Sequence, residues 1–142
     1  MLKNRFSIMI ILTALAALGL NGCYHTPEQR AEHVVNHMVS ELKLNDTQKA
    51  QLEKIKDEFL ARRPELTRQR EETMKEADEL MRSPELDKAK LNALVERNQA
   101  QANDMIRFIS AKFTEIHDML TPEQREKLVS HIEKYMERRK DK

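Results

Sequence analysis

Hydrophobic residues recur at steps of three and four along most of this chain, which is the period of an α-helix. One such series comprises Leu91, Leu94, Val95, Ala102, Met105, Ile109, Phe113, Ile116 and Leu120. A second comprises Leu52, Ile55, Phe59, Leu66, Met74, Ala77 and Leu80. We therefore predict an all-α fold with four helices, over residues 27–42, 46–82, 84–119 and 122–139.

Polar residues suited to helix N-termini precede each predicted helix. The tetrapeptide Thr-Pro-Glu-Gln occurs at Thr26–Gln29 and again at Thr121–Gln124. In each copy the threonine can cap the helix, the proline occupies the first turn without losing a hydrogen bond, and the glutamine completes a capping box. Asn45–Gln48 repeats the arrangement without proline, and Ser83-Pro84 predicts the start of the helix over 84–119.

The two long predicted helices indicate an elongated, bent antiparallel hairpin with two short flanking helices. A helix of 36 residues is about 55 Å long. Pro64 lies inside the second predicted helix and should kink it, in a charged stretch that leaves a thin core. Because such an arm buries little apolar surface by itself, a dimer along it is expected.

Residues 1–22 have the pattern of a signal peptide. Lys3 and Arg5 precede an apolar run from Ile8 to Leu20, which is shorter than the roughly 20 residues of a membrane-spanning helix. The end of this segment, Leu20–Cys23, resembles a bacterial lipobox. That resemblance implies acylation of Cys23, with a lipidated tether at 23–26 and attachment to the outer membrane. The helical domain is expected over 27–142. The alternative is an ordinary secretory signal.

Composition and the absence of known motifs argue against several classes of function. Two of the 25 basic residues lie in 1–22, so 23 remain against 24 acidic residues. A net charge of −1 does not favour nucleic-acid binding. Both glycines also lie in 1–22, which disfavours tight β-turns. No catalytic motif or glycine-rich phosphate loop occurs, and we expect no enzymatic activity.

Two pentapeptides resemble the paired LTxxQ motifs of the Spy/CpxP family, which also includes zinc-resistance and CnrX-type metal-sensor proteins. The motif residues are Leu44, Asn45 and Gln48, and Leu120, Thr121 and Gln124. The resemblance implies a hooked four-helix protomer in a cradle-like periplasmic dimer. It also implies binding of unfolded or envelope proteins without ATP, or reporting of stress to a sensor kinase. Within this chain, the motifs are interpreted as structural corners.

Candidate client-binding residues lie in the predicted kinked arm. The methionines are adaptable apolar contacts, and the arginines could attract acidic segments. The candidates are Arg62, Arg63, Met74 and Met81. The alternative is that the methionines fill the core and the arginines belong to a solvated face, since acidic residues are interleaved with them.

A metal site is a second hypothesis. His33 and His37 are four residues apart and share a helix face, a spacing that suits Zn, Ni or Co. Resemblance to CnrX-type sensors adds a carboxylate from Glu53 or Glu58 and a late histidine, His117. The alternative is that the histidines are partly solvated helix residues, with no cofactor required. The sequence thus leaves open a stress-related binding protein, a heavy-metal sensor or resistance protein, and a structural envelope lipoprotein.

Overall fold

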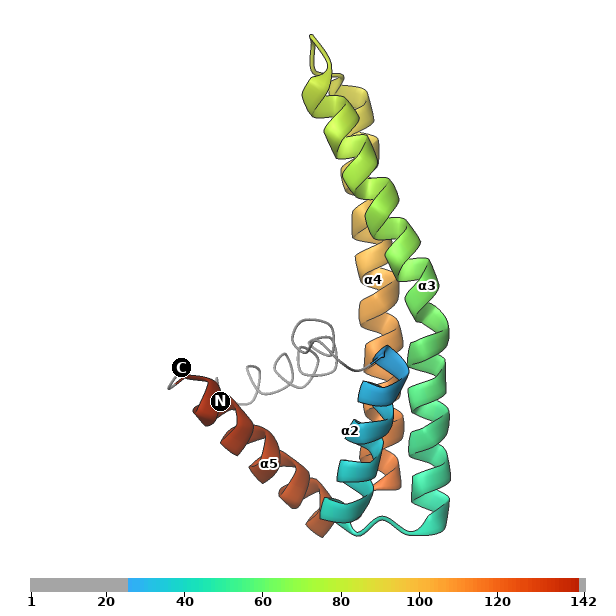
Figure 1. Cartoon of the computed structure of the whole chain (residues 1–142), viewed down its shortest axis with the longest axis vertical. Coiled ribbons are helices and arrows are strands. Elements are labelled where there is room, and N and C mark those ends of the chain that lie inside the picture. Colours follow the sequence, from blue (N-terminus) through green and yellow to red (C-terminus); the bar gives the residue numbers. More distant parts are fainter. Residues whose placement is uncertain (1–25, 141–142) are drawn as a thin grey trace. The chain divides into compact units, whose positions relative to one another are not determined.

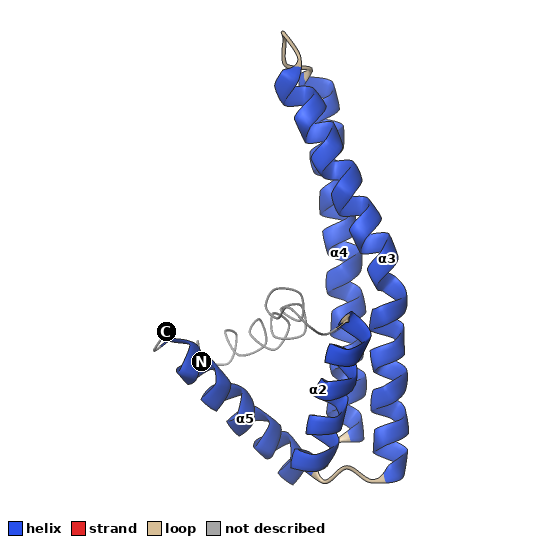
Figure 2. Ribbon diagram, viewed as in Figure 1, coloured by secondary structure: helices blue, strands red, loops and turns tan. Residues whose placement is uncertain are grey.

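The computed structural model describes residues 26–140, which form four α-helices and no strand (Figures 1 and 2). These are α2 (Pro27–Leu42), α3 (Asp46–Arg82), α4 (Lys88–Met119) and α5 (Pro122–Lys140). The predicted all-α class is confirmed. The predicted signal peptide, the lipidated Cys23 and most of the 23–26 tether lie outside the described residues. None of the helices within 26–140 is both long and apolar enough to cross a membrane.

Capping boxes begin three of the helices, at the positions that the sequence predicts. In each box the side-chain oxygen of the capping residue accepts the backbone N–H of the glutamine three residues later. The N···O distances are 3.3 Å for Thr26, 2.9 Å for Asn45 and 3.3 Å for Thr121. In return, each glutamine Oε1 accepts the backbone N–H of its capping residue, at 2.9–3.0 Å. These reciprocal bonds satisfy donors that have no partner in the first turn of a helix.

The start of α4 differs from the prediction by four residues. Ser83 does not cap a helix; its hydroxyl lies 2.8 Å from the Leu80 carbonyl oxygen and belongs to the end of α3. Asp87 is the capping residue, because its Oδ1 accepts the Lys90 N–H at 3.0 Å and its carbonyl accepts the Leu91 N–H at 3.0 Å. Both serine and aspartate are good capping residues, so local preference alone did not distinguish them.

The turn between α2 and α3 uses a residue with positive φ where glycine is common. Lys43 has φ 51° and ψ 52°. Its N–H bonds the Ser40 carbonyl, and the next N–H, of Leu44, bonds the Val39 carbonyl at 3.0 Å. This pairing ends α2 in a Schellman arrangement, which satisfies its last carbonyls.

The chain divides into two compact units. Unit 1 contains α2, the first part of α3 to Leu60, the last part of α4 from Lys112, and α5. Its core is formed by apolar side chains that are at most 4% exposed: Val35, Leu42, Leu52, Ile55 and Leu120. All three capping boxes lie in this unit, so its helix ends and its core are built together.

Unit 2 comprises residues 61–111, the rest of α3 and α4 with the turn that joins them. Within it the helices pair in antiparallel fashion, as the contacts of Arg62 with Asp104 and of Thr73 with Asn98 show. Leu94 is the one buried apolar side chain among residues 61–111. The expected thin core is therefore observed. Helix α3 continues through Pro64, while the kink, the cradle and the dimer remain predictions.

Candidate functional site

The two sequence motifs meet through their glutamines in unit 1. The Gln48 amide nitrogen donates to Gln124 Oε1 at 2.8 Å and to the Met119 carbonyl at 2.7 Å. The Gln124 amide nitrogen donates to Gln48 Oε1 and to the Leu42 carbonyl, both at 3.2 Å. Each glutamine thus bonds the last residue of the helix that precedes the other motif. We call this arrangement the glutamine clasp.

The chemistry of the clasp explains why glutamine stands at both positions. Each Oε1 accepts two bonds, one from its own capping residue and one from the other amide, and each nitrogen donates two. A carboxylate could accept these bonds but could not donate them. Gln48 is 7% exposed, so an unmade bond there would be costly. With every polar atom of the two amides engaged, the clasp holds the two corners together and leaves no amide group for a ligand.

The remaining motif residues support the same corner. Leu120 is 3% exposed, and Leu44 is half-buried. Arg125 donates from Nη1 to the Leu120 carbonyl at 2.8 Å and to the His117 carbonyl at 3.1 Å, at the end of α4. Asn45 and Thr121 are exposed and act through their capping bonds. The motif residues therefore act as a structural unit.

Two largely buried lysines join the helices of unit 1. Lys56 on α3 bonds Glu32 of α2 at 2.7 Å and Glu53 at 2.5 Å. Lys112 on α4 pairs with Glu58 of α3 and, at 2.6 Å, with Glu115. These bonds raise the pKa of both lysines. Hydrogen bonding to Lys56 likewise lowers the pKa of Glu32, and bonding to Lys112 lowers the pKa of Glu58.

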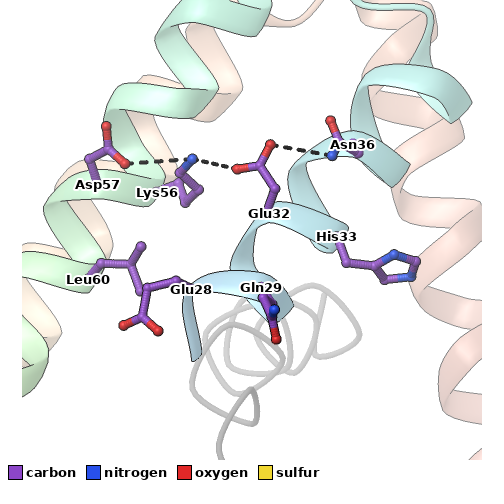
Figure 3. A pocket seen from close by; sticks show the side chains of 8 residues that line it. All are labelled: Glu28, Gln29, Glu32, His33, Asn36, Lys56, Asp57 and Leu60. Carbon is purple, nitrogen blue, oxygen red and sulfur yellow. Dashed lines mark hydrogen bonds and ion pairs between the residues drawn. The ribbon is translucent and has the colours of Figure 1, made fainter. Parts of the chain in front are cut away.

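The Glu32–Lys56 bond lies in a shallow cleft of about 630 Å³ between α2 and α3 (Figure 3). Leu60 is the one fully apolar side chain in its lining, which otherwise consists of polar and charged groups. Lys56 also lies 3.6 Å from Asp57, so the cleft's charges largely pair with one another. His33 lines the cleft but points away from the Glu32–Lys56 bond (Figure 3).

The five metal-ligand candidates are not brought together. Glu53 and Glu58 pair with lysines, and His117 Nδ1 lies 2.9 Å from Asp118 Oδ1. The ring of His37 instead approaches His131, with centroids 6.4 Å apart. Within the described residues, no three histidine, cysteine, aspartate or glutamate side chains form a group that could hold a metal ion. The metal hypothesis therefore stays a prediction without an assembled ligand set.

The four candidate client-binding residues separate into two kinds. Arg62 faces inward in unit 2, where Nη1 bonds Asp104 at 2.7 Å and the guanidinium lies 4.2 Å from the Phe108 ring centroid. Arg63 is exposed and makes no ion pair with another described residue. Met74 and Met81 are 64% and 85% exposed. Arg63, Met74 and Met81 are therefore available to a partner, whereas Arg62 holds α3 against α4.

One side of unit 2 carries exposed apolar residues on both helices. Each residue of a helix is rotated by about 100° from the one before it. Arg63 and Met74 each follow an inward-facing residue of α3, while Val95 follows buried Leu94 on α4. Because α3 and α4 are antiparallel, these following positions lie on the same side of the pair. We define the apolar face as Met74, Ala77 and Met81 of α3 with Leu91, Val95, Ala102 and Ile106 of α4.

Arginines with and without ion-pair partners are distributed over the two sides of unit 2. Arg63 and Arg70 flank the apolar face along α3, and neither forms an ion pair with another described residue. The opposite side carries the residues that precede the inward positions, and several of these are paired. Arg68 bonds Glu65 at 2.6 Å and Glu72 at 2.5 Å, and Arg97 bonds Glu76 at 2.7 Å. The apolar face therefore combines exposed hydrophobic surface with unpaired positive charge.

The sequence reasoning missed part of this face. Leu91 and Val95 belong to the hydrophobic series that predicts this helix from the sequence, yet they are 36% and 46% exposed. Ile106, 55% exposed, was not a candidate at all. A signal was present, because Leu91, Val95, Ala102 and Ile106 are spaced by four, seven and four residues and form a second stripe beside the one containing Leu94. One packed hairpin cannot bury both stripes.

The fold and the clasp define an all-α protein whose two glutamine-bearing helical corners interlock. Compared with known protein families, residues 30–132 match the LTXXQ motif family. The match covers most of the chain and includes both motifs. The protein therefore belongs to the LTXXQ motif family. No curated protein and no solved structure matches it.

Proposed function

We propose that this protein binds unfolded or partner proteins without ATP, as a periplasmic stress protein of the Spy/CpxP type. The observation that carries the proposal is the apolar face of unit 2. Its large side chains Met74, Met81, Val95 and Ile106 are 46–85% exposed. A contiguous exposed apolar surface is a common mark of an interaction site, since scattered single residues need no partner.

Charge complementarity favours an occupant that is both apolar and acidic. Arg63 and Arg70 lie along the apolar face with no ion pair to a described residue, so an incoming carboxylate would not have to displace an existing partner. Electrostatic attraction of this kind speeds encounter and selects among partners. We therefore propose acidic, unfolded segments as the preferred clients.

Aggregation of two reduced proteins of opposite charge tests the proposal. Reduced α-lactalbumin is acidic and reduced lysozyme is basic, and both aggregate once their disulfides are broken. The purified protein should delay light scattering by α-lactalbumin at equimolar concentration without nucleotide, and should delay that of lysozyme less. If α-lactalbumin aggregates at the same rate with and without the protein, the proposed function is wrong.

Matched variants locate the activity on the apolar face. Val95→Ser/Ile106→Ser removes apolar surface from that face and should abolish most of the delay. Ala93→Ser/Ala100→Ser changes exposed positions elsewhere on α4 and should leave the delay unchanged. Circular dichroism establishes that both variants retain helix. Equal activity in the two double variants would place binding somewhere other than the apolar face.

The same proposal includes a lipid anchor. The family is generally periplasmic, and Cys23 follows a lipobox-like segment, Leu20–Gly22. We propose acylation of Cys23 and attachment to the outer membrane. Metabolic labelling with a palmitate analogue should mark the wild-type protein and leave Cys23→Ala unlabelled. Equal labelling of both proteins would contradict the assignment, and membrane fractionation would distinguish the outer from the inner membrane.

A further inference from the structure

The two most exposed methionines of the described chain lie on the apolar face. Met74 is 64% exposed and Met81 is 85% exposed. The other methionines within the described residues are half-buried: Met38, Met105, Met119 and Met136. Methionine oxidation follows solvent access to the thioether sulfur. An oxidant in solution should therefore reach Met74 and Met81 before the others.

The position of this pair links oxidation to binding. Met74 follows inward-facing Thr73 on α3. Met81 is seven residues further on, which is close to two helical turns, so it lies on the same side of the helix as Met74. Ala77 lies between them on the same side and is too small to cover either side chain. Both thioethers therefore belong to one continuous surface, and both would be buried by a partner that occupies the apolar face.

We propose that Met74 and Met81 form an oxidation-sensitive pair, whose conversion to sulfoxide switches off binding at the apolar face. The inference rests on the proposed function. The oxidant is a peroxide or a hypohalous acid. With hydrogen peroxide, the thioether sulfur attacks one oxygen and the O–O bond breaks. The sulfur loses two electrons and becomes a sulfoxide, and the other oxygen leaves as water.

Sulfoxide formation changes the surface without disturbing the fold. The new oxygen is a strong hydrogen-bond acceptor, and burying it against an apolar partner without a donor is unfavourable. Because neither methionine is buried in the folded chain, the helices should stay intact while affinity for a partner falls. Reduction by methionine sulfoxide reductases restores the thioether, so the change is reversible.

Peptide mass spectrometry and a binding measurement test the pair separately. Protein treated with limiting hydrogen peroxide and quenched with free methionine should gain oxygen at Met74 and Met81 before Met105 or Met119. The probe is labelled carboxymethylated α-lactalbumin, which is acidic and stays unfolded, and its binding is followed by fluorescence anisotropy. Oxidation should weaken binding of this probe roughly tenfold or more, and reductase treatment should restore it.

A leucine variant provides the matched control. Met74→Leu/Met81→Leu keeps apolar side chains at these positions but has no sulfur there. Its affinity for the probe before oxidation serves as its own reference, and peroxide treatment should leave that affinity unchanged. Met105→Leu should remain as sensitive as the wild type. If the double leucine variant loses binding on oxidation as the wild type does, or if the oxidised wild type binds unchanged, the inference is overturned. If the reduced wild type does not bind at all, the proposed function fails and the inference fails with it.

Discussion

Gln48 and Gln124, 76 residues apart in the chain, each donate an amide N–H to the other's side-chain oxygen, at 2.8 and 3.2 Å. The same amides bond the carbonyls of Met119 and Leu42, the last residues of α4 and α2. The start of α3 is thereby joined to the end of α4, and the start of α5 is joined to the end of α2. In this chain the two motifs thus couple two helical turns, and their contribution to stability can be measured by substitution.

Replacing Gln48 with glutamate should destabilise the fold at neutral pH. A carboxylate keeps the capping bond to the Asn45 N–H, but it loses both donated bonds and faces two oxygen acceptors. We expect Gln48→Glu to lower the free energy of unfolding by about 2 kcal/mol or more, measured by urea denaturation at pH 7. Burial beside acceptors should raise the pKa of the new carboxyl, so the deficit should shrink as pH falls and the neutral acid can donate.

Gln29→Glu is the matched control for that substitution. Gln29 has the same place in the capping box of α2, is exposed, and has no cross-corner bond to a described residue. Glutamate can make the same capping bond, and negative charge is favourable at a helix N-terminus. The unfolding free energy should change by about 0.5 kcal/mol or less. Similar losses in the two variants would mean that the cross-corner bonds contribute little.

Arg62 and its neighbour Arg63 should respond differently to the same change. Arg62→Gln removes the ion pair with Asp104 and the contact over Phe108, in an environment that remains partly solvated. We expect a loss of about 1 kcal/mol in unfolding free energy for Arg62→Gln and almost none for Arg63→Gln. A double-mutant cycle with Asp104→Asn isolates the ion pair. Equal stability of the two arginine variants would contradict the inward assignment of Arg62.

Acid should weaken the link between α3 and α4 in unit 1. The bond with Lys112 holds the folded-state pKa of Glu58 below its ordinary value of 4.5. The Glu58 carboxylate therefore stabilises the fold above pH 4.5, and this contribution is lost as pH falls through the lowered pKa. Glu58→Gln should unfold at lower urea concentration than wild type at pH 7, with the difference shrinking below pH 4.5. Glu126→Gln, at an exposed position without an ion pair to a described residue, should follow the wild type throughout.

The heat released on adding metal ions should not depend on His33 and His37 of α2. Glu53 and Glu58 pair with lysines, and the described residues contain no group of three side chains that could hold a metal ion. Calorimetry with Zn²⁺, Ni²⁺ and Co²⁺ should therefore give the same weak heats for the wild type and for His33→Ala/His37→Ala. A strong heat that disappears in the double variant would instead support the metal-sensor hypothesis.

The sequence by itself determined the helical class and most helix boundaries. Thr26, Asn45 and Thr121 mark helix starts because a capping box is closed by residues three apart, so its physics is contained in a short stretch of chain. The predicted start of α4 was wrong because Ser83 and Asp87 satisfy the same local rule. In the folded chain Ser83 bonds the end of α3, and Asp87 is the cap.

The tertiary structure alone decided which side chains meet and which remain exposed. The periodicity of α4 is compatible with two neighbouring stripes, and pairing with α3 buried Leu94 while leaving Val95 and Ile106 exposed. Arg62 and Arg63 are adjacent and chemically identical, yet a rotation of about 100° between them turns one toward Asp104 and the other outward. The meeting of Gln48 with Gln124 likewise depends on long-range packing, because nothing in either pentapeptide specifies the other as its partner.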